Sequence, residues 1–142
     1  MENKGFFSID FIFTLSFILI IGILFLNLAD NNIKSSINLE ENVESRIVLN
    51  KIANSINEVN SNGEGFSKII ETPNNISGKN YLIIISSKDI SLEINNKKGI
   101  NFLLPFKLVD TNGIEILERK IYSGNNYIIE KVSNDKINIR EF

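Results

Sequence analysis

The distribution of apolar residues divides the chain into three parts, and the first is an almost unbroken apolar run from Phe6 to Ala29. A bilayer core of about 30 Å needs about 20 helical residues at about 1.5 Å each, so the run is long enough to span a membrane. One alternative is a buried helix of a soluble protein, but the remaining chain is too small to surround it. Another is a removable secretory signal, whose apolar core is usually about 7–15 residues long and ends in a small-x-small site. Here the run is longer, and Asn27-Leu28-Ala29 lacks the first small residue.

The second part has the pattern of an amphipathic helix. Apolar residues recur at mostly three- to five-residue steps, with Asn, Ser, Glu and Lys between them, and no proline interrupts the chain from Phe6 to Asn60. We therefore expect one helix over residues 6–62, whose second half packs on the domain of its own chain. The positions expected to form its apolar face are Ile33, Ile37, Val43, Ile47, Ile52, Ile56 and Val59.

The third part, residues 66–142, has the pattern of a β domain. Short apolar or alternating runs are separated by turn residues, most clearly at Asp110-Thr111-Asn112-Gly113. Residues 66–70 are expected to form a short turn of helix or a strand. The fold class is therefore α+β, with a long N-terminal helix packed on one small antiparallel sheet. The six predicted strands are Tyr81–Ser86, Ile90–Ile94, Ile100–Val109 (broken by Pro105, as in an edge strand or bulge), Ile114–Ile121, Tyr127–Val132 and Lys136–Phe142.

Charges flanking the apolar run predict its orientation. Lys4 precedes the run and Asp30 follows it. The positive-inside rule then places the short N-terminus in the cytoplasm and the C-terminal domain outside the cell.

Asp10 is an acid near the start of the apolar run. An Asp at the centre of a membrane helix costs roughly 2.5–3.5 kcal/mol on insertion scales. Because Asp10 lies only about one turn into the helix, its carboxylate can reach the headgroups. The functional alternative is that it meets a positive charge within an assembly.

These residues, Lys4-Gly5-Phe6 followed by Ser8-Ile9-Asp10-Phe11, resemble the N-terminus of archaeal type IV pilin-like precursors with a class III signal peptide. The chain has Phe6 where that class usually has Gln, and Asp10 where it has Glu. The resemblance implies a leader over residues 1–5 that a prepilin-type peptidase cleaves between Gly5 and Phe6, with Lys4 and Ser8 contributing to recognition. It also implies that Asp10 pairs with the new amino group of a neighbour's Phe6 during assembly.

The resemblance further implies a subunit, expected to be a minor one, of a surface filament or pseudopilus-like complex. Its partners would be other pilin-like subunits, the leader peptidase, an assembly platform with its ATPase, and membrane lipid. The alternative is an uncleaved, single-pass, membrane-anchored extracellular domain that forms no filament. In that case Gly5-Phe6 is incidental, and Asp10 only reaches the headgroups.

Composition narrows the chemistry. The 142 residues include no Cys and no His, which excludes disulfides, thiolate metal sites and histidine bases. The net charge of −2 gives no basic patch for nucleic acid, and the sequence contains no catalytic motif, so we expect neither an enzyme nor a cofactor. One modification motif is present: Asn75-Ile76-Ser77 is an N-glycosylation sequon in a predicted extracellular loop.

Overall fold

The computed structural model describes residues 9–142, so the predicted leader and recognition residues Lys4, Gly5, Phe6 and Ser8 lie outside the described residues. Residues 9–142 form one long helix, α1 (Ile9–Ser61), followed by eight strands. The predicted α+β class is confirmed. The chain divides into two compact units between Leu39 and Glu40, and each is described separately.

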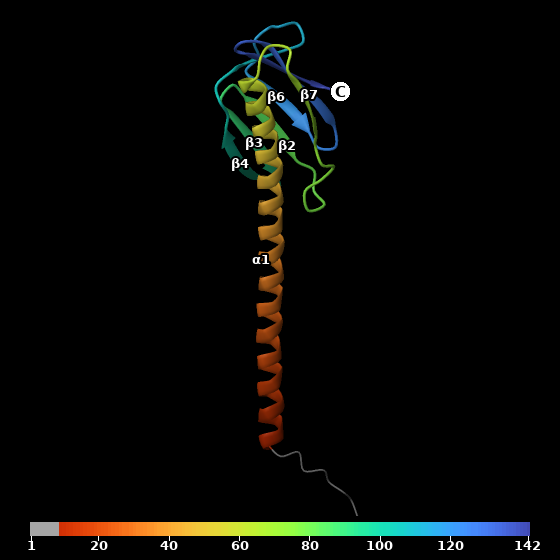
Figure 1. Ribbon diagram of the computed structural model, residues 1–142. Helices are drawn as coiled ribbons and strands as arrows, with labels where there is room; N and C mark the ends of the chain where they lie inside the picture. The colour runs from red at the N-terminus through yellow and green to blue at the C-terminus, as the bar shows by residue number, and fades with distance from the viewer. Residues whose placement is uncertain (1–8) are drawn as a thin grey trace, which may run out of the picture. The chain divides into compact units, whose positions relative to one another are not determined.

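The strands form two sheets of four strands each, with the orders β1-β7-β8-β5 and β4-β3-β2-β6. Figure 1 shows the C-terminal part of α1 crossing the sheet that contains β2, β3 and β4. All strand pairs are antiparallel except β5 with β8, which is parallel. The strands are β1 (Ser67–Glu71), β2 (Leu82–Ser86), β3 (Asp89–Ile94), β4 (Lys97–Phe102), β5 (Lys107–Val109), β6 (Glu118–Tyr122), β7 (Asn126–Ser133) and β8 (Lys136–Glu141).

The prediction of a single antiparallel sheet is wrong, and Pro105 gives the physical reason. Proline has no backbone N–H for a ladder, and its fixed φ turns the chain. The predicted strand over residues 100–109 is therefore split into β4 in one sheet and β5 in the other. The linking residues stay close to the β2–β3 turn, because Leu103 N donates to Lys88 O at 2.8 Å and Phe106 N donates to Ser87 O at 3.2 Å.

The helix face that packs on the sheets also differs from the predicted one. Ile52, Ile56 and Val59 are buried as expected, but Ile47 is 60% exposed. The face of α1 that packs on the sheets follows a helical repeat displaced around the axis from the predicted row. Of the predicted row, Ile33, Ile37, Val43 and Ile47 are exposed, whereas the buried residues of α1 are Glu41, Val48, Leu49, Ile52, Ala53, Ser55, Ile56 and Val59.

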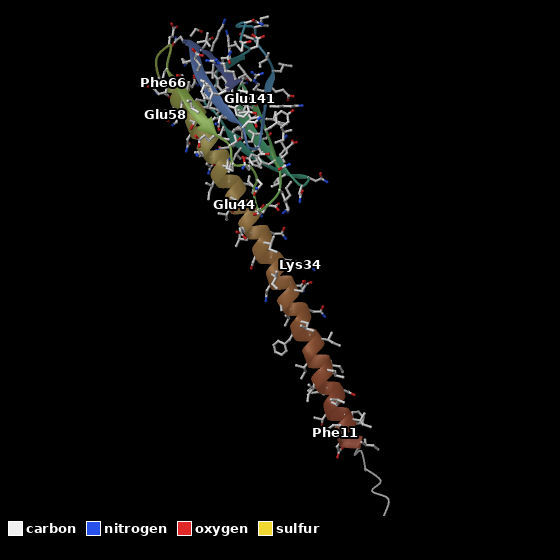
Figure 2. The ribbon with its side chains drawn as sticks, turned by 90° about the vertical axis from the view of Figure 1, so that its right-hand side faces the viewer. Phe11, Lys34, Glu44, Glu58, Phe66 and Glu141 are labelled. Atoms are coloured by element: carbon white, nitrogen blue, oxygen red, sulfur yellow. The ribbon has the colours of Figure 1, made fainter. Side chains whose placement is uncertain are left out.

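Polar contacts hold β4 alongside this part of the helix. Asn101 Nδ2 donates to Asn50 Oδ1 at 2.9 Å. Further along both elements, Leu104 N donates to Asn57 Oδ1 at 2.9 Å. At the end of the helix, Figure 2 shows Glu58 near Phe66, where the chain turns into the first sheet. The helix and β4 therefore run beside each other in the same direction.

We predict that Ile56→Ala costs about 2–5 kcal/mol of unfolding free energy, because it opens a cavity in the core at a side chain with 0% exposure. The matched control is Ile47→Ala on the same helix, which should change stability by less than about 0.5 kcal/mol. Urea unfolding of the full chain in detergent, followed by the fluorescence of the buried Tyr81 and Tyr127, measures both. Equal losses would contradict this description of the helix faces.

Candidate functional site

The apolar segment of α1 is the first candidate functional region. Its side chains are exposed on every side, and Figure 2 shows them projecting from the helix around Phe11. An 18-residue window of α1 reaches a mean hydropathy of 2.7, and none of that window is buried. Among residues 9–142, α1 is the one helix long and apolar enough to span a membrane, which is consistent with membrane anchoring.

Asp10 lies in the first turn of α1. Its backbone carbonyl accepts a hydrogen bond from Thr14 Oγ1 at 2.7 Å. This bond occupies the Thr14 hydroxyl inside the helix, so the polar group is satisfied locally, as an apolar surrounding requires. The predicted cleavage site and the recognition residues precede the described part of the chain, so their roles stay predictions.

Glu41 is a buried acid that sequence reasoning missed. Its side chain is 1% exposed, and it lies on the same helix face as Val48 and Ile52. Lys97 Nζ, at the start of β4, donates to its Oε1 at 3.1 Å, and Lys79 Nζ donates to its Oε2. A signal was present in the sequence, because Glu41 precedes Val48 by seven residues and therefore falls on the same face of the helix.

The two lysines determine the charge state of Glu41. Hydrogen bonds from Lys79 and then Lys97 hold the pKa of the Glu41 carboxyl below its ordinary value of 4.5, against the opposing effect of burial. The carboxylate therefore stays ionised in the folded domain. Because Lys79 and Lys97 come from two separate segments, one side chain ties both to the helix.

A second acid of the helix, Glu44, binds the turn that carries the sequon. Its Oε2 accepts hydrogen bonds from Ser77 N at 2.8 Å and from Ser77 Oγ at 3.0 Å. Ile76 and Lys79 exchange two backbone hydrogen bonds of 2.9 Å, which close a tight turn in which Ser77 and Gly78 have φ of 48° and 75°. Figure 2 places Glu44 on the helix beside the domain.

Asn75, the predicted glycosylation acceptor, lies at the start of this turn and is exposed. Its Oδ1 accepts a hydrogen bond from Gly78 N at 3.2 Å. The bond fixes the side-chain amide at the surface, with the oxygen turned toward the backbone. The structure thus places the acceptor residue at the surface and the sequon's Ser77 against the helix.

A solvent-open cavity of about 350 Å³ lies at the Asp110 turn. The Asp110 carboxylate is used within the turn, where its Oδ1 accepts from Asn112 N and Ile114 N at 2.9 Å each. Asn138 Nδ2 donates to the Asp110 carbonyl oxygen at 2.7 Å. Across residues 9–142, no group of three or more acidic side chains is placed to hold a metal ion. The Asp110 side chain and carbonyl oxygen at this cavity are thus both engaged in hydrogen bonds of the domain itself.

Comparisons of the chain with protein-family models, with characterised proteins and with solved structures gave no significant match.

We predict that the ion pairs of Glu41 make the domain sensitive to acid. The folded-state pKa of Glu41 is lowered, so its contribution is present above the unfolded pKa of 4.5 and is lost as the pH falls through the folded-state pKa. Glu41→Gln should lower stability at pH 7 and flatten the loss of stability between about pH 5 and pH 3. Urea unfolding of the full chain in detergent across this range tests the effect.

Asp135→Asn is the matched control for Glu41→Gln. The pKa of Asp135 is also lowered, by a hydrogen bond from Lys107, but its side chain is 55% exposed. Because exposed ion pairs contribute little, this variant should change the acid dependence less than Glu41→Gln does. The same flattening in both variants would rule out a special role for the buried acid.

We predict that Asn75 carries a glycan when the chain is expressed in a host whose N-glycosylation machinery is intact. The intact mass of the membrane-extracted protein should then exceed the peptide mass, and Asn75→Gln should remove the difference. Asn74→Gln is the control, since it alters the neighbouring exposed amide and keeps the sequon. A mass equal to that of the peptide in the unaltered protein would refute the modification.

Proposed function

We propose that the chain is a type IV pilin-like subunit, expected to be a minor one, that a prepilin-type peptidase processes and that assembles through its N-terminal helix. It would be cut between Gly5 and Phe6, held in the membrane with its β domain outside the cell, and built into a surface filament or pseudopilus-like complex. Its partners would be other pilin-like subunits, the leader peptidase, and an assembly platform with its ATPase.

The observation that carries the proposal is the position of Asp10 at the start of the apolar helix. The acid follows Gly5-Phe6 by a few residues, in the spacing of the archaeal class that the N-terminus resembles. Asp10 lies in the first turn of α1, at one end of an apolar segment whose side chains are exposed. Neighbouring helices of the same kind, with lipid, would cover that segment.

The proposed chemistry of assembly is electrostatic. Cleavage creates an amino group at Phe6, which would meet the Asp10 carboxylate of a neighbouring subunit. A positive and a negative group attract strongly where water is excluded, whereas either one alone is costly there. The pair would therefore fix the axial stagger between subunits, because other staggers leave both charges without partners.

A second observation agrees with assembly through the helix. Beyond the apolar segment, α1 still presents Val43 and Ile47 to solvent, 49% and 60% exposed, on the side away from the sheets. A helix that packs among other helices buries apolar side chains at such positions.

We predict that Asp10→Asn leaves membrane insertion and leader cleavage intact but prevents assembly. The amide keeps the shape of the carboxylate but loses its charge, so the amino group of Phe6 has no counter-ion. N-terminal sequencing of the membrane-extracted protein reports cleavage, and sedimentation of sheared cell-surface material reports filaments. Thr14→Val is a control, since it alters a polar side chain one turn further along the helix and keeps the charge of Asp10.

Two outcomes would contradict the proposal. A mature chain that begins at Met1 would support the alternative, an uncleaved membrane-anchored extracellular domain. Normal assembly of the Asp10→Asn variant would leave filament formation possible but remove the electrostatic mechanism.

A further inference from the structure

One exposed apolar surface of the β domain is the outward face of β4. Side chains alternate along a strand, and Gly99 and Asn101 face the helix: a Cβ on Gly99 would lie 3.6 Å from Leu49 Cδ2, and Asn101 binds Asn50. Their neighbours along the strand, Lys98, Ile100 and Phe102, therefore point the other way. Ile100 and Phe102 are 60% and 80% exposed, and Lys98 is exposed as well. We call Lys98, Ile100 and Phe102 the β4 row.

A second exposed row lies on α1 within the same unit. Val43 lies about 180° and Ile47 about 140° around the helix axis from the buried Ile52, at about 100° per residue. The exposed Glu40 precedes them on this side of the helix. We call Glu40, Val43 and Ile47 the helix row.

The two rows match in spacing and in charge when they are placed side by side in the same direction. Val43 and Ile47 follow Glu40 by about 4.5 and 10.5 Å along a helix. In the β4 row, Ile100 and Phe102 follow Lys98 by about 6.6 and 13 Å. Parallel alignment thus places acid opposite base at one end and apolar residues opposite each other further along. The reverse alignment would set Glu40 against Phe102.

The parallel direction is also the one that a common membrane requires. Two copies anchored by the same N-terminal segment enter their domains from the same side. Within one copy, α1 and β4 run beside each other in the same direction, so a neighbour's helix row approaches the β4 row in parallel.

We propose that the helix row of one subunit docks on the β4 row of the next, so that the occupant of this surface is a second copy of the chain. This inference rests on the proposed assembly of the chain and names the contact that its β domain uses. Because the contact joins two different surfaces, a bound pair has the β4 row of one copy and the helix row of the other still free. Such heterologous contacts generate open, helical assemblies unless the rotation closes a ring.

Disulfide cross-linking between two tagged copies tests the contact, since the chain has no cysteine of its own. One copy carries Ile47→Cys and the other carries Phe102→Cys, each with a different C-terminal tag, and both are oxidised in intact cells. We expect a product that carries both tags. Ile47→Cys combined with Ile69→Cys is the matched control, because Ile69 is an apolar β1 residue with 54% exposure, and we expect no such product.

A third pair separates this inference from the proposed function. Leu19→Cys in one copy with Ile23→Cys in the other, called the Leu19 pair, reports self-association through the apolar segment, because the proposed contact of Phe6 with Asp10 sets residue 19 level with residue 23 of the neighbour. If the Leu19 pair cross-links but the Ile47–Phe102 pair does not, the proposed contact is wrong and the filament proposal stands. If neither pair cross-links, both proposals fail. Equal cross-linking of Ile47 with Phe102 and with Ile69 would also overturn the contact, since it indicates collision without docking.

A charge exchange tests the alignment. Glu40→Lys in the copy that carries Ile47→Cys should lower the yield of the Ile47–Phe102 product roughly threefold, because it places a lysine opposite Lys98 of the other copy. Adding Lys98→Glu to the copy that carries Phe102→Cys should restore the yield. Lys98 also lies 3.3 Å from Glu93 of its own chain, so Glu93→Gln serves as the control for loss of that internal pair. No recovery in the exchanged pair would overturn the parallel alignment.

Discussion

The structure of the β domain depends on the burial of one face of the last third of α1. A single hydrophobic cluster contains helix residues such as Ile52 and Ile56 together with residues of both sheets, among them Ile83 and Ile129. Each sheet has four strands, and the apolar faces of both contribute to this one cluster. The helix supplies apolar side chains to the core of both sheets, which explains why its last third has one buried apolar face.

Glu41 adds specificity to this packing. Apolar contacts are non-directional and tolerate small shifts of a helix along its groove. A buried carboxylate does not tolerate such shifts, because it must stay within hydrogen-bond reach of both Lys79 and Lys97. The ion pairs thus fix the axial position of the helix against two segments of the domain. Glu44 adds a second polar contact one turn later through Ser77.

Sequence patterns predicted the helix, the α+β class and most of the strands, because these follow from local periodicity and turn residues. They failed where a distant partner decides the outcome. The alternation of apolar and polar residues does not show which sheet a strand joins. The passage of the chain from one sheet to the other at Pro105 was therefore not predicted. Spacing identified an apolar row that includes Ile47, but the sheets cover the face of Val48 and Leu49. Glu41 resembled a solvated charge, since its two lysines lie 38 and 56 residues away in the sequence.

The helix row is the part of α1 where the predicted and the observed packing differ. Val43 and Ile47 have the apolar character of core positions, yet the domain packs against the other side of the helix. The apolar side chains of the helix row, one turn apart and next to Glu40, form the surface that we propose a second subunit covers. Val43 and Ile47, which the apolar spacing assigned to the packed face, thus belong to the surface at which we propose that two copies meet.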